Sequence, residues 1–327
     1  MPIDWAPFVE LVRRHQRFLL TTHIRPDGDA LGSILALGEV LRLKGKQVRL
    51  VNASAMPARY AFLDPDGRVE HFSPPGEEYR DAEVVLVMDT GTWNQLGAFG
   101  PFLKSSSAAK VVIDHHMTQD DLGAVRLVDT SAEATGRLAY EAIQALGGPL
   151  PASAASMLYV AVAMDTGWFR HSNMSAATHT LAANLLEAGA RSDLLWQELY
   201  ERDTLPRKKL IGRVHDRLQV VHGGRVAYTE VRLADYAETG ASPADTEDLI
   251  DCTRSVAGVE VGLFFMEQPR GGVKVSFRSR GVDVARLAER FGGGGHKLAS
   301  GCVIEASLEE ARARVLEAVG AALTNKE

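Results

Sequence analysis

The first half of the chain alternates between short apolar segments and longer segments with helical periodicity. The apolar segments at 84–88 and 110–113 are continuous and rich in β-branched residues, which is typical of strands buried on both faces. Two more strands are expected at 18–22 and 46–51. Apolar residues recur at helical spacing over 29–44, 132–146, 152–164 and 176–188. Strands that alternate with helices predict a parallel sheet covered by helices.

The second half changes character and predicts a smaller mixed α/β domain. Residues 218–222 and 225–231 flank Gly223 and Gly224, a pattern that predicts a β-hairpin. Further strands are expected at 259–266, 273–277 and 301–304, and helices at 246–256, 282–291 and 308–323. Antiparallel pairs among these strands would give a mixed sheet.

The length of the chain predicts two domains, since 327 residues exceed what one hydrophobic core usually covers. We expect the first domain at 1–190, a linker at 191–214 and the second domain at 215–327. The linker is rich in charge and contains ERDTLPRKKLIGR. A surface helix of the first domain is an open alternative for this segment.

Composition narrows the class of ligand. A net charge of −6 and a pI of about 6.0 argue against a broad basic surface for long nucleic acid, but not against short anionic ligands. The two cysteines, Cys252 and Cys302, form no C-x-x-C pair, which favours a reducing cytoplasm. The N-terminal segment does not read as a signal peptide, and no segment offers ~20 consecutive apolar residues. We therefore expect a cytoplasmic protein that does not span a membrane.

Groups that could bind metals follow the predicted strands and one predicted helix. They are His23, Asp27, Asp29, Asp89, the triplet Asp114, His115 and His116, and Asp165. The carboxyl ends of parallel strands share one edge of a sheet, so these groups could converge. Carboxylate oxygens mixed with imidazole nitrogens suit divalent manganese, cobalt, zinc or magnesium. A single aspartate in such a position is more often a helix cap or turn residue, so the prediction of a two-metal site depends on the whole set.

Two segments of the second half could bind phosphate. Gly292–Gly295 and His296 follow a predicted helix, and glycine backbone can approach an anion closely. Arg278 and Arg280 alternate near the end of a predicted strand, so both could face the same side, and guanidinium groups suit phosphate. A flexible loop at the glycines and a solvated surface charge at Arg280 are the open alternatives.

Taken together, these motifs resemble the DHH phosphoesterase family with its DHH-associated C-terminal domain. The segments that carry the resemblance are TTHIRPDGDALGS, VMDTG, DHH, MDTGWFR and GGGGHKLASG. The sequence is most similar to the branch of nanoRNA exonucleases that are also phosphatases of adenosine 3',5'-bisphosphate. Ser300 stands where the family often has alanine, a small-for-small change.

The resemblance implies a role for each candidate residue. His23 and Asp27 would bind a first metal, Asp89 would bridge, and a second metal would be bound by Asp29, His115 and Asp165. His116 would lie beside the substrate as hydrogen-bond donor or general acid, and Asp114 would orient the histidines. The substrate contacts would be Arg278, Ser279, Gly293, Gly294, Gly295 and His296.

The resemblance also implies an activity. Residues 1–190 would be the catalytic metal-binding domain, residues 215–327 would bind the substrate, and the active site would lie in the cleft between them. Two divalent ions, manganese in the first place and cobalt or magnesium as alternatives, would activate a water for attack on phosphorus. The expected substrates are short single-stranded RNAs and small nucleotides rather than long duplexes, and a homodimer is a family-based expectation. A phosphodiesterase for cyclic di-AMP or linear dinucleotides and a non-catalytic nucleotide- or RNA-binding protein remain the alternatives.

Overall fold

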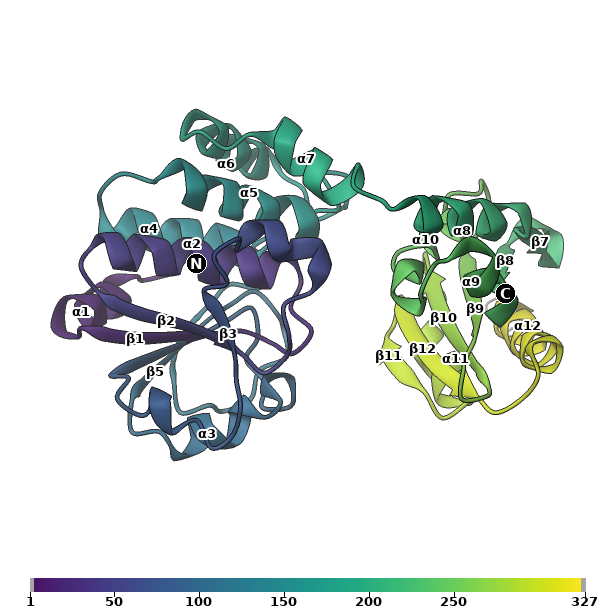
Figure 1. The fold of residues 1–327 in the computed structure, drawn as a ribbon, viewed down its shortest axis with the longest axis horizontal. Coiled ribbons are helices and arrows are strands. Elements are labelled where there is room, and N and C mark those ends of the chain that lie inside the picture. The colour runs from purple at the N-terminus through teal and green to yellow at the C-terminus, as the bar shows by residue number, and fades with distance from the viewer. Residues whose placement is uncertain (1–2, 325–327) are drawn as a thin grey trace. The chain divides into compact units, whose positions relative to one another are not determined.

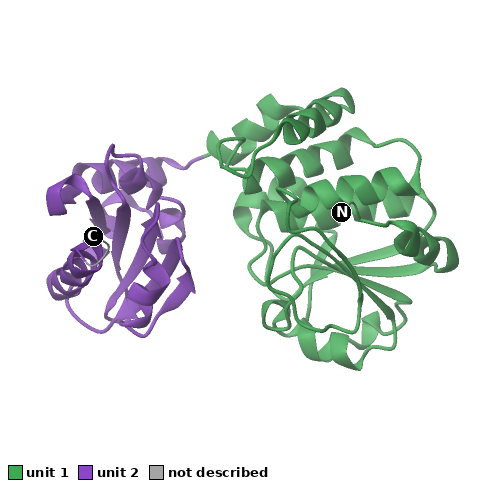
Figure 2. Ribbon diagram, turned by 180° about the vertical axis from the view of Figure 1, so that it is seen from behind, with its two compact units in different colours: residues 1–202 green, residues 203–327 purple. Residues whose placement is uncertain are grey.

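The computed structural model describes residues 3–324 (Figure 1). They fold into two compact units that divide between Arg202 and Asp203 (Figure 2). The segment predicted as a linker contains two helices, α7 (Ser192–Tyr200) in the first unit and α8 (Leu205–Asp216) in the second. Each unit has its own hydrophobic core.

The first unit contains a six-stranded parallel sheet in the order β3-β2-β1-β4-β5-β6. Its strands are β1 (Arg17–Thr21), β2 (Gln47–Asn52), β3 (Val69–His71), β4 (Val84–Met88), β5 (Ala109–Asp114) and β6 (Val125–Val128). The predicted parallel sheet is therefore confirmed. The sequence did not predict the two edge strands, β3 and β6, because they are short and only partly buried, and neither needs a continuous apolar run.

Helices cover both faces of this sheet, with more layers of helices on one face than on the other (Figure 1). They are α1 (Ala6–Arg14), α2 (Gly28–Leu43), α3 (Phe99–Ser105), α4 (Thr135–Leu146), α5 (Ala152–Asp165) and α6 (Ala176–Glu187), with short 3₁₀ segments η1 (Ala58–Leu63), η2 (Glu77–Tyr79) and η3 (Asn94–Leu96). Figure 1 shows α2, α4 and α5 on one side of the sheet, α6 and α7 beyond α5, and α3 on the other side. Because α2 lies between the sheet and α5, it is buried almost all round, as its apolar sequence requires.

The second unit contains a mixed sheet in the order β11-β12-β10-β9-β8-β7, in which only β8 and β9 pair in parallel. Its strands are β7 (Gln219–Val221), β8 (Val226–Val231), β9 (Val261–Glu267), β10 (Val273–Ser279), β11 (Gly294–His296) and β12 (Ala299–Ile304). Its helices are α8, α9 (Leu233–Thr239), α10 (Asp251–Arg254), α11 (Val284–Glu289) and α12 (Leu308–Thr324), with η4 (His222–Gly224) and η5 (Pro243–Thr246). The predicted smaller mixed sheet is confirmed.

Two elements of the second unit differ from the prediction made for them, and helix α9 was not predicted. The helix expected at 246–256 is reduced to α10, because Asp248 has a left-handed backbone with φ of 63° that no continuous helix allows. The glycine run, for which a flexible loop was the open alternative, partly forms strand β11, which pairs with β12. In both places the outcome depends on the rest of the unit rather than on local preference.

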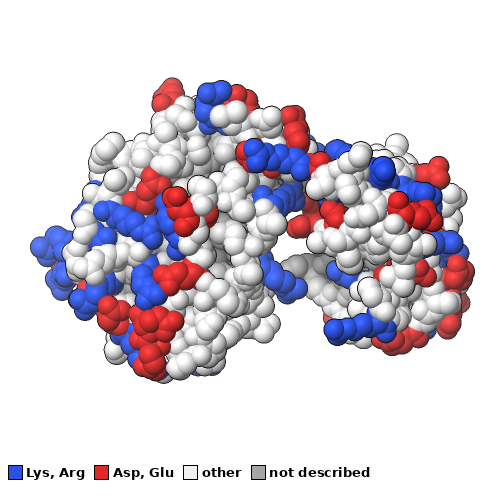
Figure 3. All heavy atoms as spheres, in the orientation of Figure 1, with Lys and Arg blue, Asp and Glu red and all other residues white. Residues whose placement is uncertain are grey.

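The surface carries charges of both signs. On the face of the first unit shown in Figure 3, Lys and Arg side chains lie beside Asp and Glu side chains. Cys252 and Cys302 are free thiols. Within residues 3–324, no helix combines the length and the apolar character needed to cross a membrane.

Glycine at position 32 allows α2 and α5 to pack closely. A Cβ at Gly32 would overlap with the carbonyl oxygen of Met157 and lie 3.0 Å from Ala161 Cβ, whereas a Cβ at Gly38 of the same helix would meet a flexible end, 2.8 Å from Leu50 Cδ2. We expect Gly32→Ala to lower the free energy of unfolding by about 1–3 kcal/mol, as overpacking does, and Gly38→Ala to lower it less. Urea denaturation followed by circular dichroism measures both, and an equal loss would contradict this account.

Candidate active site

The candidate metal ligands gather where the strand order of the first sheet reverses. The chain runs from β1 outward to β2 and β3, then crosses back to β4 on the other side of β1. The carboxyl ends of neighbouring parallel strands at such a reversal form the usual ligand crevice of open α/β sheets. His23 follows β1, Asp89 follows β4 and His115 follows β5. All three lie at this edge because the strands that precede them are parallel neighbours.

Asp27 and Asp29 enter the site from the start of α2. Asp27 is the N-cap residue, and its Oδ1 accepts hydrogen bonds of 3.0 Å from the backbone N–H groups of Asp29 and Ala30. Gly28 separates the two carboxylates, and a Cβ there would lie 2.5 Å from Met164 Cγ. Two carboxylates at a helix N-terminus are favoured by the unpaired N–H groups and the dipole of the helix.

A first group of ligand atoms surrounds His23. Its Nε2 lies 3.4 Å from Asp89 Oδ2 and 3.9 Å from Asp27 Oδ1. His23 Nδ1 lies 2.9 Å from the carbonyl oxygen of Ile24, and that carbonyl can accept only a proton carried by Nδ1. The ring thus presents an unprotonated Nε2 toward the carboxylates when it is neutral, as a metal ligand must.

A second group surrounds His115. Its Nε2 lies 3.6 Å from both Asp89 Oδ1 and Asp165 Oδ2, and 3.9 Å from Asp29 Oδ2. His115 Nδ1 faces the carbonyl oxygen of Ala132 at 3.2 Å, which again directs Nε2 toward the carboxylates. Asp165 reaches this group from the last residue of α5.

Asp89 is the residue that the two groups share. Its Oδ2 faces His23 and its Oδ1 faces His115, so each oxygen belongs to a different group. Asp89 is buried and has a left-handed backbone with φ of 61°, which aspartate tolerates better than most residues. The sets His23–Asp27–Asp89 and Asp29–His115–Asp165 each place their ligand atoms within 4.8 Å of one another and could hold a metal ion.

The electrostatics of the site favour a cation. Burial raises the pKa of Asp29 well above its usual range, and the neighbouring carboxylates of Asp89 and Asp165 add to this effect. Burial also raises the pKa of Asp165 to about 6, against the opposing influence of His115. Burial opposes the charge of His23, but its hydrogen bond with Asp89 prevails and raises the pKa of the imidazole to about 9. Carboxylates crowded in this way would ionise together more readily beside a divalent metal.

His116 lies at the same edge of the sheet, but its Nδ1 faces a carboxylate oxygen of Asp114 rather than a backbone carbonyl. Its side chain is 53% exposed, and its Nδ1 lies 2.8 Å from Oδ1 of the fully buried Asp114. Gln119 donates a hydrogen bond to the other oxygen of Asp114. The hydrogen bond with Asp114 raises the pKa of His116 to about 9 despite partial burial. This ring can therefore carry a proton at neutral pH, with Nε2 left as its second donor.

The sequence did not point to the residues that fix the carboxylates. The N-terminus of α4 faces Asp29, whose Oδ2 accepts from Thr135 N at 2.7 Å and whose Oδ1 accepts from Gly136 N at 2.8 Å. The hydroxyl of Thr135 donates to Asp89 Oδ1 at 2.8 Å, and Ser33 Oγ lies 3.3 Å from Asp29 Oδ1. The segment SAEATGRL indicates a helix start preceded by polar residues. It does not indicate that this helix start contacts Asp29, which lies more than 100 residues away in the sequence.

In the second unit, Arg278 and His296 fall in one row of the sheet. Arg278 on β10 is directly opposite Ala299 on β12, and Ala299 is directly opposite His296 on β11. Directly paired residues share a face, so both side chains leave the same side of the sheet, with the small Ala299 between them. His296 is exposed and Arg278 is half-buried.

The other predicted substrate residues have structural roles of their own. Ser279 is buried, and its Oγ accepts hydrogen bonds from Gly281 N at 3.0 Å and Val282 N at 2.7 Å. A Cβ at Gly293 would overlap with the carbonyl oxygen of Gly301, and a Cβ at Gly295 would lie 2.7 Å from that of Ala299. Gly294 is exposed and has nothing within 4 Å of its Cβ position. The row that contains Arg278 does not include Ser279, whose role as a substrate ligand stays a prediction.

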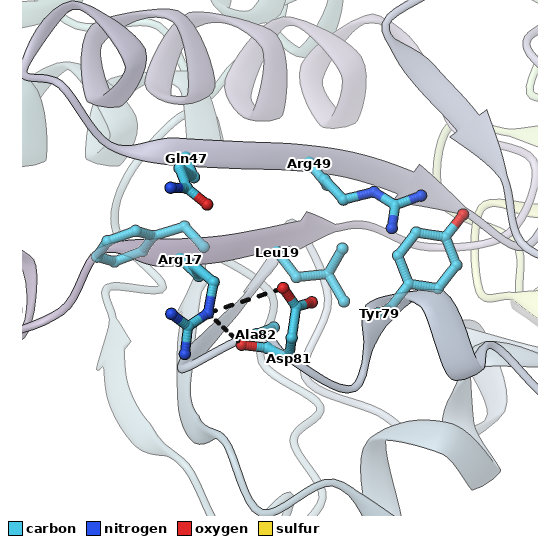
Figure 4. Close-up of a pocket in the computed structure, with 8 residues that line it drawn as sticks. Arg17, Leu19, Gln47, Arg49, Tyr79, Asp81 and Ala82 are labelled. Carbon is cyan, nitrogen blue, oxygen red and sulfur yellow. Dashed lines mark hydrogen bonds and ion pairs between the residues drawn. The ribbon is translucent and has the colours of Figure 1, made fainter.

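A small pocket lies at the opposite, amino-terminal end of β1 and β2 (Figure 4). Arg17 Nε donates to the carbonyl oxygen of Asp81 at 2.7 Å and lies 3.7 Å from its carboxylate. The guanidinium of Arg49 lies 4.1 Å from the centre of the Tyr79 ring and pairs with Glu70. Both arginines are therefore engaged within the protein, and the chemistry of the chain is concentrated at the other end of the strands.

Comparison with known proteins agrees with this geometry. The profile of the DHH family, N-terminal domain, matches residues 17–162, and that of the DHHA1 domain matches residues 223–325. The chain is 31% identical over 307 residues to the bifunctional oligoribonuclease and PAP phosphatase NrnA of Thermus thermophilus, covering 93% of this chain and 90% of that protein. The chain belongs to the DHH family.

Two further similar proteins extend this comparison. The NrnA protein of Bacillus subtilis is 29% identical over 302 residues, covering 90% of this chain and 92% of that protein. An exopolyphosphatase-related protein from Bacteroides fragilis shares the fold, with a TM-score of 0.90 at 23% identity over 98% of this chain and 95% of that one. The matched DHH segment contains five of the six candidate metal ligands, and Asp165 lies just beyond its end.

We expect metal binding at this DHH site to depend on pH. The pKa of Asp165, raised to about 6, means that protons compete with a metal below this pH, so Mn²⁺ should raise the melting temperature more at pH 7.5 than at pH 5. Without metal, the stability of the protein changes with pH in the opposite direction. The folded carboxyl holds its proton more tightly than the unfolded one, so this contribution to stability is lost as pH rises through about 6. Differential scanning fluorimetry with Mn²⁺ or with chelator checks both trends.

The Asp165→Asn variant is the matched control for this experiment. It removes the titrating carboxyl but keeps the shape of the side chain, so the Mn²⁺-dependent shift should be smaller and should change less between the two pH values. An equal Mn²⁺ shift at pH 5 and pH 7.5 in the unaltered protein would contradict the role given to these carboxylates.

Proposed function

We propose that this protein is a two-metal phosphoesterase that hydrolyses very short RNAs and removes the 3'-phosphate of adenosine 3',5'-bisphosphate. The observation that carries the proposal is the position of Asp89, whose two oxygens face two separate groups of ligands. A carboxylate shared in this way is what two neighbouring ions around one phosphate require. The relatives from Thermus thermophilus and Bacillus subtilis are named as oligoribonuclease and PAP phosphatase, which supports the choice of substrate.

Two divalent ions would be held by the residues at this edge. His23 and Asp27 would hold one, Asp29, His115 and Asp165 the other, and Asp89 both. Hard oxygen ligands mixed with imidazole fit manganese, with cobalt or magnesium as alternatives. When bound, such ions lower the pKa of a shared water and neutralise phosphate oxygens.

The remaining steps fall to side chains of the protein. His116 would donate a hydrogen bond or a proton from Nε2 to the substrate, and its hydrogen bond with Asp114 favours this role because it raises the pKa of the ring. Asp114 would keep this ring oriented through its bond to Nδ1. Thr135 and the N-terminus of α4 would hold Asp89 and Asp29 in place.

The second unit would bind the substrate. Arg278 and His296 offer donors on one side of its sheet, and Gly294 leaves open space beside them. The net charge of −6 and the mixed charges of the first unit support short substrates rather than long duplexes. A cytoplasmic location and a homodimer belong to the same proposal.

A panel of hydrolysis assays tests the proposal. We expect Mn²⁺-dependent turnover of di- to pentanucleotides and of adenosine 3',5'-bisphosphate, inhibition by chelator, and no turnover of cyclic di-AMP. Asp89→Ala should lower kcat at least about 1,000-fold while the far-ultraviolet circular dichroism stays unchanged, because both ligand groups lose their shared member. Asp66→Ala, at an exposed turn residue, serves as the control and should behave as the unaltered protein.

Other results would point elsewhere. Activity retained by Asp89→Ala would overturn the two-metal assignment. Preferential opening of cyclic di-AMP would assign the protein to the turnover of a cyclic dinucleotide. Tight binding of short RNA without hydrolysis, under all metal conditions, would identify a binding protein instead.

A substitution at Thr135 tests whether its hydrogen bond positions Asp89. Thr135→Val keeps the shape of the side chain but removes the hydroxyl that donates to Asp89. We expect kcat to fall about 10- to 100-fold with little change in KM, as for other groups that orient metal ligands. Thr135→Ser, which restores the hydroxyl, should restore most of the activity, and Thr180→Val on the exposed side of α6 is the control. A serine variant as weak as the valine variant would indicate a packing role only.

A further inference from the structure

Arg25 lies in the loop between two candidate metal ligands of the first unit. His23 precedes it by two residues and Asp27 follows it by two. Because consecutive Cα atoms are about 3.8 Å apart, the Cα atom of Arg25 is at most about 7.6 Å from that of either ligand. An arginine side chain is longer than that of histidine or aspartate, so its guanidinium can reach a group that is bound between them.

The backbone of Arg25 has a conformation that arginine disfavours. Its φ is 54°, in the left-handed region, which glycine, asparagine and aspartate adopt more readily than other residues. Pro26 follows, and a residue before proline is restricted further toward extended conformations. Arginine is therefore less stable at this position than asparagine would be, so the backbone does not explain the choice of residue.

Contacts from a neighbouring loop hold this conformation. The backbone N–H of Arg25 donates to Ser54 Oγ at 2.8 Å, and the backbone N–H of Ser54 donates to Asn52 Oδ1 at 2.6 Å. Asn52 Nδ2 donates in turn to the carbonyl oxygen of His23 at 2.9 Å. The bond to Ser54 involves only the backbone of Arg25, so it explains the turn of the loop but gives no role to the side chain.

The guanidinium of Arg25 is not engaged within the protein. Arg25 is exposed, and within residues 3–324 its guanidinium makes no hydrogen bond, ion pair or ring contact. By contrast, Arg170, which follows Asp165 by five residues, donates from Nε to the carbonyl oxygen of Gly167 at 2.7 Å. Neither burial nor an internal partner accounts for an arginine at position 25, which points to a ligand outside the chain.

A phosphate at the metal edge matches this side chain. Under the proposed function, metal ions would engage the carboxylates of Asp27 and Asp89. A phosphate bound to two ions keeps oxygen lone pairs that the ions do not use. A guanidinium offers parallel N–H donors that fit two phosphate oxygens at once and carries a positive charge at any physiological pH.

We propose that Arg25 binds the phosphate that is hydrolysed, as a substrate ligand supplied by the first unit alone. The inference rests on the proposed function, which puts a phosphate at this edge of the sheet, and deepens it by naming a further substrate ligand. The strained backbone is consistent with this role, because strained residues persist where the surrounding structure holds them for function.

Binding of inorganic phosphate tests the role of Arg25 without the rest of a substrate. Calorimetric titration of the full chain with Mn²⁺ bound gives the Kd for phosphate, and a separate titration gives the Kd for Mn²⁺. In Arg25→Gln, we expect the Kd for phosphate to rise about 10- to 100-fold, as for the loss of a hydrogen bond between charged groups. The Kd for Mn²⁺ should change less than about 3-fold, because arginine is no metal ligand.

The Arg25→Asn variant separates binding from folding. Asparagine adopts a φ of 54° more readily than arginine. Without metal or phosphate, this variant should therefore melt about 2–4 °C higher than the unaltered protein, yet it should bind phosphate as weakly as Arg25→Gln. Differential scanning fluorimetry in chelator measures the shift. A lower melting temperature would show that the side chain supports the fold and would overturn the proposal.

Two further variants are the controls. Arg126→Gln removes an exposed arginine of β6 and should bind phosphate as the unaltered protein does. Arg25→Lys keeps the charge but not the planar fork, so it should restore only part of the loss. A phosphate affinity of Arg25→Gln equal to that of Arg126→Gln, or an equal loss of Mn²⁺ affinity, overturns the role of Arg25.

Hydrolysis of a 5'-phosphorylated dinucleotide by the same variants distinguishes this failure from that of the proposed function. Turnover by Arg25→Gln at the rate of the unaltered protein overturns the inference alone. An unaltered protein that hydrolyses neither this dinucleotide nor adenosine 3',5'-bisphosphate refutes the proposed function, and the inference fails with it.

Discussion

The structure of the first unit depends on holding four carboxylates together at one sheet edge. Asp29 and Asp89 are buried there, and Asp27 and Asp165 complete the set. Ionised carboxylates in a low-dielectric site repel one another and are stable only with hydrogen-bond donors or cations nearby. The protein supplies the donors from the N-termini of α2 and α4 and from the hydroxyl of Thr135. The charge that these donors leave uncompensated would favour a metal cation at this edge.

In the first sheet, the sequence predicted the strands that are buried on both faces and missed those at the edges. A central parallel strand such as β4 needs a continuous apolar run, which is visible in VVLVM. An edge strand such as β3, with the sequence VEH, is short and half-exposed, so its side chains carry no such pattern. The glycines of β11 have no strand preference and form a strand only because β12 offers backbone partners.

The gathering of the candidate metal ligands could be predicted because topology alone places the ends of parallel strands together. A strand of the parallel sheet precedes each of His23, Asp89 and His115. All three are therefore expected at the same edge of the sheet. The supporting residues could not be predicted in this way. The hydroxyl of Thr135 reaches Asp89 through packing between distant segments, and nothing local in the sequence encodes that contact.

The two units differ in the charge that they leave unpaired, and this difference bears on substrate choice. The first unit leaves carboxylates that favour cations, whereas the second presents the donors of Arg278 and His296 on one side of its sheet, which suit an anion. Under the proposed function, metal ions would balance the carboxylates of the first unit, and phosphate oxygens would accept from the donors of the second unit. Recognition of short nucleotides would then need only a few paired donors and ligands, without any extended basic surface.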